Sequence, residues 1–316
     1  MAGWAQANVA SVCPSQRFEQ FLPAFSADIG LQSAFLKHHV RALHLVPTAA
    51  GVVPYQPLVD SRALKFPLMT AIAHPPVDSI NLAADGLSAT YTDKRAGLGN
   101  IKVYTFAHER CWVLTGIEDW SVRDAQLKLP GTAGMSLAEQ RCAARADVYG
   151  QLGGPERYPL TAEFFQAAEE YWVCAAGSGD PDASYSAASL SMSEMAPNLG
   201  YAATEKLYLA ALKGHPDRAA MLAWYYCDGG DPAGADTCVA PAQALAVLEQ
   251  GAATGNAQAL GSLAEGLESG RLGPPDVRRA LACYRAAVQA GNNEAKPAMD
   301  RLLAKGGIAG EPAGCL

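Results

Sequence analysis

The residues best suited to chemistry lie in the stretch CDGGDPAGADTC, residues 227–238, where two cysteines bracket three aspartates and three glycines. Carboxylates in a glycine-rich loop are typical of calcium sites, which need oxygen ligands at loop positions 1, 3 and 5. Here Asp228, Asp231 and Asp236 stand at positions 1, 4 and 9. This spacing does not fit a calcium loop, so we predict no metal and no other cofactor here.

A second candidate is the run KHHVRALH, residues 37–44, which contains His38, His39 and His44. Imidazoles bind metals or act as general bases, but no ligand motif such as HExxH accompanies them. His39 and His44 are also five residues apart, which is a poor match for one helix face. Asp119 with His108 would be another hydrolase-like pair. We interpret these histidines as surface or structural residues and assign no catalytic residue.

The cysteines indicate an oxidising compartment. Their number is even and no C-x-x-C pair occurs, so common zinc and redox spacings are missing and disulfides fit better. The N-terminus has no basic region and no sustained apolar core, so we expect a mature periplasmic chain whose signal peptide has been removed. Val12 before Cys13 makes a lipid anchor there an unfavoured alternative. The cysteines are Cys13, Cys111, Cys142, Cys174, Cys227, Cys238, Cys283 and Cys315.

Charge divides the 316 residues unevenly. Residues 1–125 carry ten basic and ten acidic residues, whereas residues 126–316 carry 14 basic and 21 acidic residues, a net charge of −7. An acidic surface disfavours nucleic acid, whose phosphates need Lys and Arg. It favours a basic partner, although a merely solvated surface is the simpler alternative. No run of 18 apolar residues occurs, so we expect no membrane span.

An internal repeat organises the second part of the chain. Gly177, Gly214, Gly255 and Gly291 each follow an alanine-rich amphipathic run, at separations of 37, 41 and 36 residues. Glycine ends helices because it adopts the left-handed conformation at low cost, and asparagines such as Asn256 favour caps. Each repeat is therefore predicted to be a helix, a loop and a second helix. Such pairs cannot bury their apolar faces alone and must stack as a solenoid.

Residues 255–291 form the clearest repeat and resemble the Sel-like repeat, a relative of the tetratricopeptide repeat. The resemblance is fair for residues 215–254 and weaker for residues 178–214. It implies a solenoid of about four helix pairs with a capping helix over residues 126–306, followed by a tail at 307–316. The matching residues are Ala259, Leu260, Gly261, Leu263, Gly270, Gly273, Ala280, Tyr284, Ala286, Ala287 and Gly291.

A further unit upstream, residues 139–177, resembles the Helicobacter cysteine-rich family, whose repeats pair one cysteine on each helix. That resemblance implies a Cys142–Cys174 disulfide, since the two are 32 residues apart. A Cys227–Cys238 bridge would restrain the loop of the longest repeat. A Cys283–Cys315 bridge would tie the tail over the terminal helix, and Cys13–Cys111 remains by elimination.

The first part of the chain predicts an α+β domain over residues 16–125, after an N-terminal segment at 1–15. In residues 16–30, Phe18, Phe21, Leu22 and Phe25 share one helical face. Residues 100–121 are typical of strands, and Asp85–Gly86 predicts a turn between two more. This order resembles the nuclear-transport-factor-2-like cone, which implies helices on an antiparallel sheet around a pocket.

Aromatic and acidic residues of the repeats are the candidate contacts for a partner. The run WYY at 224–226 places three aromatic side chains in different directions around a helix, so at least one should be exposed. Aromatic residues dominate many binding hot spots, although at helical spacing they are more often core. The predicted contact residues are Trp224, Tyr225, Asp228, Asp231, Tyr185, Tyr201, Asp180 and Asp182.

These patterns favour a non-catalytic, periplasmic protein-binding module. The resemblance to Sel-like envelope inhibitors makes the sharper expectation an immunity protein that binds and inhibits a secreted antibacterial effector, such as a phospholipase. Two alternatives remain open. One is an envelope scaffold that recruits other proteins. The other is a hydrolase or β-lactam-binding enzyme that uses the N-terminal pocket.

Overall fold

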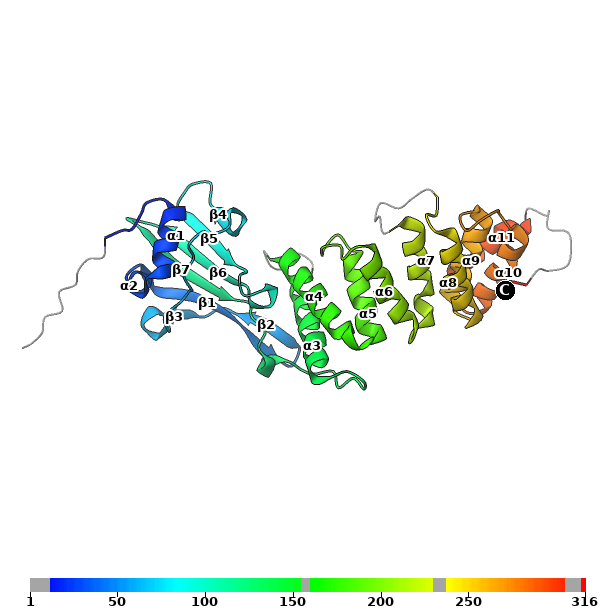
Figure 1. The fold of residues 1–316 in the computed structure, drawn as a ribbon, viewed down its shortest axis with the longest axis horizontal. Helices are drawn as coiled ribbons and strands as arrows, with labels where there is room; N and C mark the ends of the chain where they lie inside the picture. The colour runs from blue at the N-terminus through cyan, green and yellow to red at the C-terminus, as the bar shows by residue number, and fades with distance from the viewer. Residues whose placement is uncertain (1–11, 155–159, 230–236, 305–313) are drawn as a thin grey trace, which may run out of the picture. The chain divides into compact units, whose positions relative to one another are not determined.

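The computed structural model describes residues 12–154, 160–229, 237–304 and 314–316. The chain divides into two compact units, residues 1–127 and 128–316. The first unit contains a sheet with two α-helices, and the second contains helices (Figure 1). Each unit is described by itself below.

The two helices of the first unit are α1 (Phe18–Ala27) and α2 (Ile29–Ala34). The predicted face of α1 is buried, with Phe21, Leu22 and Phe25 fully enclosed. Asp28 separates the helices and caps α2, since its carboxylate accepts hydrogen bonds from the backbone N–H groups of Gly30 and Leu31 at 2.6 and 3.2 Å. The apolar spacing and the cap together fix where these helices lie.

The sheet is mixed, with strands in the order β2-β1-β7-β6-β5-β4 and β3 paired to β1. β1 runs parallel to β7, so the expectation of a purely antiparallel sheet is wrong. The predicted turn at Asp85–Gly86 does join two antiparallel strands, β4 and β5. The strands are β1 (Leu36–Thr48), β2 (Gly51–Tyr55), β3 (Leu58–Asp60), β4 (Ile80–Leu82), β5 (Ser88–Asp93), β6 (Lys102–His108) and β7 (Trp112–Asp119).

Aromatic rings fill the space between α1 and the sheet. Phe18 meets Phe106 and Trp112 edge-on at centroid distances of 5.2 and 5.0 Å, and Phe25 meets Phe106 at 5.3 Å. These edge-to-face contacts add to the burial of apolar area. The interior of this unit is therefore a packed core. Short 3-10 turns lie at Ser61–Ala63, Val77–Ser79, Leu98–Asn100 and Asp124–Gln126.

The second unit is a stack of helices in which each helix packs on the next one in sequence, from α3 to α11. This arrangement is the helical solenoid expected from the repeats. Its helices are α3 (Leu137–Leu152), α4 (Thr161–Ala175), α5 (Pro181–Ser191), α6 (Tyr201–Leu212), α7 (Ala219–Asp228), α8 (Pro241–Ala253), α9 (Ala257–Ser269), α10 (Val277–Gln289) and α11 (Lys296–Ala304). Short 3-10 turns lie at Ala176–Ser178, Pro216–Arg218 and Asn293–Ala295.

The repeat glycines serve different purposes. Gly255 and Gly291 have the predicted positive φ values, 77° and 102°. Gly214 does not have a positive φ, and a Cβ atom added to it would lie 2.6 Å from the Pro181 ring. At Gly177 the left-handed turn lies two residues later, at Gly179. Close packing therefore explains Gly214, whereas backbone conformation explains Gly255 and Gly291.

All eight cysteines form disulfides, as Cys13–Cys111, Cys142–Cys174, Cys227–Cys238 and Cys283–Cys315. The last of these holds Cys315 against α10, where the backbone carbonyl of Cys315 also accepts a hydrogen bond from Arg279 at 2.8 Å. Four disulfides indicate an oxidising, non-cytoplasmic location.

Among the residues that the structure describes, no helix combines the length and the apolar character needed to cross a membrane.

Candidate protein-binding groove

One face of α9 carries a row of polar residues that borders two adjoining cavities. Ser262, Glu265 and Ser269 are three and four residues apart, so they lie on one helix face. All three line both cavities. The opposite face of α9 carries Leu260, Leu263 and Leu267, which are buried in the core. The amphipathic pattern of α9 therefore turns its polar row toward the cavities, which together form the feature that we call the α9 groove.

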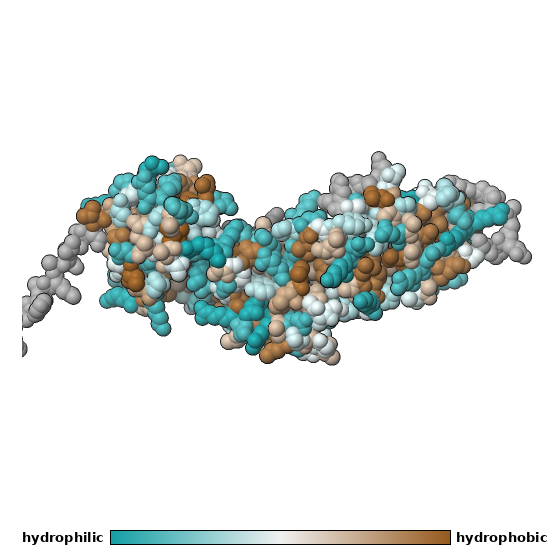
Figure 2. Space-filling view, in the orientation of Figure 1, coloured by the Kyte–Doolittle hydropathy of each residue, from teal (hydrophilic) through white to brown (hydrophobic). Residues whose placement is uncertain are grey.

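The first cavity of the groove is largely apolar. Its volume is about 280 Å³, and its apolar lining comes from Leu248 of α8, from Leu272 and from four residues of α7, which are Ala220, Ala223, Trp224 and Cys227. Trp224 is 37% exposed. A half-exposed tryptophan beside an apolar hollow is typical of a site that receives one large apolar side chain. Apolar residues lie among polar ones on the visible face of the helical unit (Figure 2).

The second cavity is larger, about 550 Å³, and polar. Its wall includes Glu265 and Glu268 of α9 and Glu294, which precedes α11. Glu268 is engaged within the protein, because it accepts hydrogen bonds from Tyr284 at 3.0 Å and from Arg301 at 2.7 Å. No ion pair involves Glu265 or Glu294 within the described parts of the chain. Their negative charge is available to a cationic group.

Tyr284 and Arg301 both bind Glu268, the carboxylate of this wall that is paired within the protein. Burial, together with the hydrogen bond to Glu268, raises the pKa of Tyr284, so its hydroxyl stays protonated and donates. The same carboxylate raises the pKa of Arg301 through its hydrogen bonds and charge. Glu268 thus fixes the orientations of two groups in the wall.

Close packing around α9 depends on two of its glycines. A Cβ atom added to Gly261 would lie 2.6 Å from the amide of Asn292, and one added to Gly266 would lie 2.4 Å from Leu272. The side-chain amide of Asn292 donates to the carbonyl of Ala257 at 3.3 Å. These glycines let the flanking segments approach α9 closely enough to form the walls of the groove.

Of the three candidate contacts near the end of α7, one side chain is exposed and two are buried. Trp224 is the exposed one of the three successive aromatic residues and lines the apolar cavity, and its role as a partner contact stays a prediction. Tyr225 and Asp228, which we predicted as partner contacts, are only 1% and 3% exposed, and this prediction is wrong. The Tyr225 hydroxyl donates to the carbonyl of Tyr201 at 3.0 Å, and Asp228 forms an ion pair with Arg271. Both side chains hold neighbouring segments together within the protein.

Three further predicted contacts, Asp180, Asp182 and Tyr185, lie at the start of α5 or on it. Asp180 caps α5 by accepting a hydrogen bond from the N–H of Ala183 at 2.9 Å. Asp182 is exposed, forms an ion pair with Arg218 and lies 3.3 Å from the Nε2 atom of His215. The Arg218 guanidinium also lies over the partly buried ring of Tyr185, at 4.3 Å. These residues form a local network on the α5 side of the solenoid and do not line the α9 groove.

Tyr201 is 43% exposed and stacks on Tyr225 at 5.0 Å. It stays a candidate contact. Asp231 and Asp236 lie outside the described residues. At the base of their loop, the N–H groups of Val239 and Ala240 donate to the carbonyls of Cys227 and Tyr226 at 2.9 and 3.1 Å. The two ends of this loop are therefore joined by backbone hydrogen bonds as well as by a disulfide.

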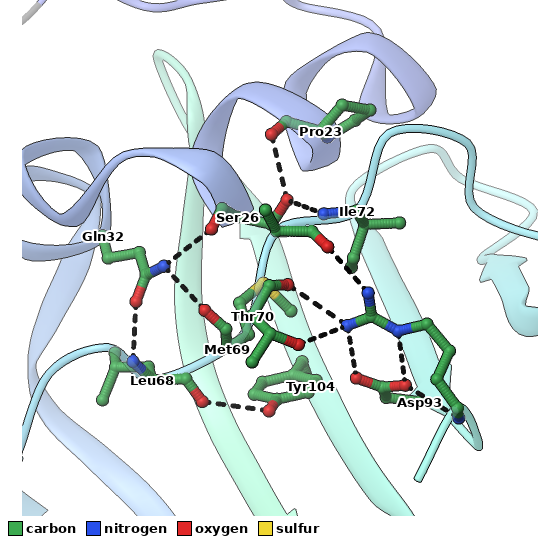
Figure 3. A network of polar contacts seen from close by, with 11 residues as sticks. Pro23, Ser26, Gln32, Leu68, Met69, Thr70, Ile72, Asp93 and Tyr104 are labelled. Carbon is green, nitrogen blue, oxygen red and sulfur yellow. Dashed lines mark hydrogen bonds and ion pairs between the residues drawn. The ribbon is translucent and has the colours of Figure 1, made fainter.

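A separate cavity of about 530 Å³ lies in the first unit, beside the segment at residues 67–72. Figure 3 shows how that segment is fixed. The buried amide of Gln32 accepts from the N–H of Leu68 at 2.7 Å and donates to the carbonyl of Met69 at 3.0 Å. Ser26 accepts from the N–H of Ile72 at 2.9 Å. The cavity wall is thus held in place by side chains from α1 and α2.

On the far side of this segment, Arg95 binds Asp93 and the carbonyls of Thr70 and Ala71 (Figure 3). Tyr104 donates its hydroxyl to the carbonyl of Leu68 at 3.0 Å, and burial raises the pKa of Tyr104. Among the residues that line this cavity there is no histidine. The arrangement is a structural network around a polar hollow.

The pair of Asp119 and His108, considered above for a hydrolase, is not brought together. In the β6–β7 pairing, Asp119 lies opposite Lys102 and His108 lies opposite Trp112, at the other end of the hairpin. Asp119 is within 3.6 Å of Lys102 and of Arg123, and His108 bonds Gln16 at 2.9 Å. His44 packs edge-on against Tyr55. His44 lies opposite Asp119 in the parallel pairing of β1 with β7, but among the described residues no hydrogen bond or ion pair joins Asp119 to a histidine.

Most of the residues of the α9 groove were not among the predicted contacts. Gln258, Ser262, Glu265 and Ser269 form a polar stripe at spacings of four, three and four residues, which was visible in the sequence. Nothing in the sequence, however, showed that Trp224 of one repeat would border the same cavity as Glu265 of the next. That juxtaposition depends on how neighbouring repeats stack.

No protein-family model matches this chain. The search of curated proteins found no match either. Among solved structures, the chain is similar to a protective antigen of uropathogenic Escherichia coli that displays an SLR fold, with 22% identity and a TM-score of 0.42 over 53% of this chain and 34% of that chain. It is also similar to a Sel1 repeat protein from Oxalobacter formigenes, with 20% identity and a TM-score of 0.41 over 55% of this chain and 66% of that chain. The chain thus spans about a third of the antigen's length. The nuclear-transport-factor-2-like and Helicobacter resemblances stay predictions.

Proposed function

We propose that this protein binds a protein partner through the α9 groove and has no catalytic activity of its own. The observation that carries the proposal is the polar row of α9, which joins an apolar cavity beside Trp224 to an acidic cavity at Glu265 and Glu294. An apolar pocket next to unpaired carboxylates complements a segment in which a large apolar residue adjoins Lys or Arg.

The chemistry of the groove sets the roles of its residues. Trp224 would pack against the large apolar residue of the partner, which we call the apolar anchor. Because Trp224 is partly exposed in the free protein, that residue can reach it. Glu265 would pair with the adjacent cation, because it lines both cavities. The net charge of −7 would further accelerate the approach of a basic partner.

Selection of displayed random peptides on the purified protein tests this proposal. Enriched peptides should contain an aromatic or aliphatic residue adjacent to Lys or Arg. Trp224→Ala should weaken binding of the tightest-binding peptide by about tenfold or more. Met221→Ala is the matched control, since Met221 lies on the same helix, is also 37% exposed and lines neither cavity. Peptides without basic residues, or equal losses in both variants, would argue against the groove.

We propose in addition that the partner is a secreted antibacterial effector, such as a phospholipase, which the protein inhibits in the periplasm. The four disulfides, which suit an oxidising compartment, and the acidic repeats support this finer proposal. An activity assay of an effector encoded beside this protein tests it. Stoichiometric loss of effector activity is the expected result. Binding that leaves the effector fully active would favour a scaffold instead.

A further inference from the structure

A cluster of metal-ligating side chains lies in the first unit, on strands β1 and β3. His38 and His39 are neighbours in β1, and Asp60 ends β3. The antiparallel pairing of these strands places His39 directly opposite Asp60. One ligand atom from each of the three residues lies within 4.8 Å of the others. This is the number and kind of ligand that many transition-metal sites contain.

The two imidazoles converge, although they are consecutive residues of a strand. Consecutive side chains of a regular strand point to opposite faces of the sheet. Here the two Nδ1 atoms are 3.1 Å apart, and the ring centroids are 4.4 Å apart. The pairing of β1 with β7 shifts register between Leu36 and Arg41, and such irregularities redirect side chains. The irregular segment of β1 contains both histidines.

The separation of the Nδ1 atoms fits a shared cation. Two nitrogens that each lie about 2.0–2.1 Å from one metal ion are about 3.0–3.4 Å apart. Without a cation, a neutral pair explains the same distance only if one Nδ1 carries the proton and the other accepts it. Both side chains are exposed, so water has access to complete a coordination shell.

The third side chain is held in a defined orientation. Asp60 accepts hydrogen bonds from the Nε of Arg62 at 3.0 Å, from its terminal nitrogen at 2.6 Å and from its backbone N–H at 2.9 Å. Carboxylate oxygens have further lone pairs, so these bonds leave Asp60 able to bind a metal. The charge of Arg62 opposes a cation, but its side chain is 81% exposed, and solvent screens it.

We propose that His38, His39 and Asp60 form a binding site for one divalent transition-metal ion, with the two Nδ1 atoms and one carboxylate oxygen as ligands. Imidazole nitrogens suit Zn²⁺, Ni²⁺ and Cu²⁺, whereas Mg²⁺ and Ca²⁺ prefer all-oxygen shells. The cysteines do not compete for the ion, because all eight are in disulfides.

Calorimetric titration of the full, oxidised chain with Zn²⁺ tests the site. We expect one equivalent to bind, with no response to Mg²⁺ or Ca²⁺. His38→Ala and His39→Ala should each weaken this binding by about tenfold or more, and Asp60→Asn should weaken it less. His44→Ala is the matched control, because His44 lies on the same strand outside the cluster. It should bind Zn²⁺ like the wild type.

Nitrogen chemical shifts of the histidine rings give a second readout, which does not depend on affinity. Zn²⁺ should shift the Nδ1 resonances of His38 and His39 and leave those of His44 and His108 in place. Absence of binding, coordination through Nε2, or an equal loss of binding in His44→Ala would each overturn the proposal. The two imidazoles would then be an ordinary hydrogen-bonded pair.

Discussion

At the scale of single residues, the most unusual group in the helical unit is Glu169. This carboxyl group lies on α4 and is only 2% exposed. Burial raises the pKa of Glu169 to about 7, and the neighbouring charge of Glu170 adds to the shift. Its Oε1 atom makes no hydrogen bond to the described residues. The folded protein therefore holds this side chain in its neutral form more firmly than the unfolded chain does.

This shift makes folding stability depend on pH. The native state binds the proton more tightly, so stability is greatest below the usual pKa of 4.5 and falls as the pH rises from there to about 7. Glu169→Gln should remove that loss and raise the unfolding free energy at pH 8 by about 3 kcal/mol. Urea unfolding of the helical unit at pH 5 and pH 8 measures the effect. Glu194→Gln, an exposed control, should leave the pH dependence unchanged. If the unfolding free energy changed equally between pH 5 and pH 8 in Glu169→Gln and in the wild type, the account would be contradicted.

At the scale of elements, the features that could be predicted from the sequence are those that neighbouring residues determine. The apolar face of α1, the turn at Gly86 and the caps at Asn256 are local features, and the structure contains them. β1 was missed because its burial does not alternate cleanly, so KHHVRALH lacks a strand pattern. Its parallel pairing with β7 joins segments about 75 residues apart. No local signal could indicate that pairing.

The candidate sites, like the parallel strand pairing, depend on contacts between segments far apart in the sequence. The exposure of Trp224 was expected from three successive aromatic residues, but which of them is exposed depends on the packing of α7 between its neighbours. Tyr225 and Asp228 are buried because they bind segments from other repeats. The convergence of His38, His39 and Asp60 needs both the irregularity of β1 and the register of β3. Tertiary pairing therefore determines all of these sites.

The segment at residues 67–72 offers a test at the scale of elements. Gln32 is fully buried and links Leu68 and Met69 to α1. Gln32→Ala leaves three hydrogen bonds unmade and a cavity in the core, so it should lower the unfolding free energy by about 2–4 kcal/mol. The amide proton of Leu68 should also exchange faster with solvent. The exposed Gln56→Ala is the control. Unchanged exchange at Leu68 would show that the network does not hold the segment.

At the scale of the whole molecule, the two units differ in chemistry. The first carries no net charge and encloses an aromatic core, whereas the repeats carry the net charge of −7. Each repeat also buries small residues such as Ala187, Ala211 and Ala264, which let helices pack closely. Stacking then leaves the polar row of α9 facing a groove that no single repeat could form. The acidic groove, presented by a disulfide-bonded solenoid, is the basis of the proposed binding function.

Charge reversal in the groove tests this central claim most directly. The measurement is the affinity of a basic, apolar-anchored peptide selected on the wild type, at low and at high salt. Glu265→Lys should weaken binding by about tenfold or more and reduce its dependence on salt. Glu194→Lys makes the same charge change at an exposed position outside the groove and should leave affinity nearly unchanged. If both charge reversals weaken peptide binding equally, or if neither weakens it, the α9 groove is not the binding site.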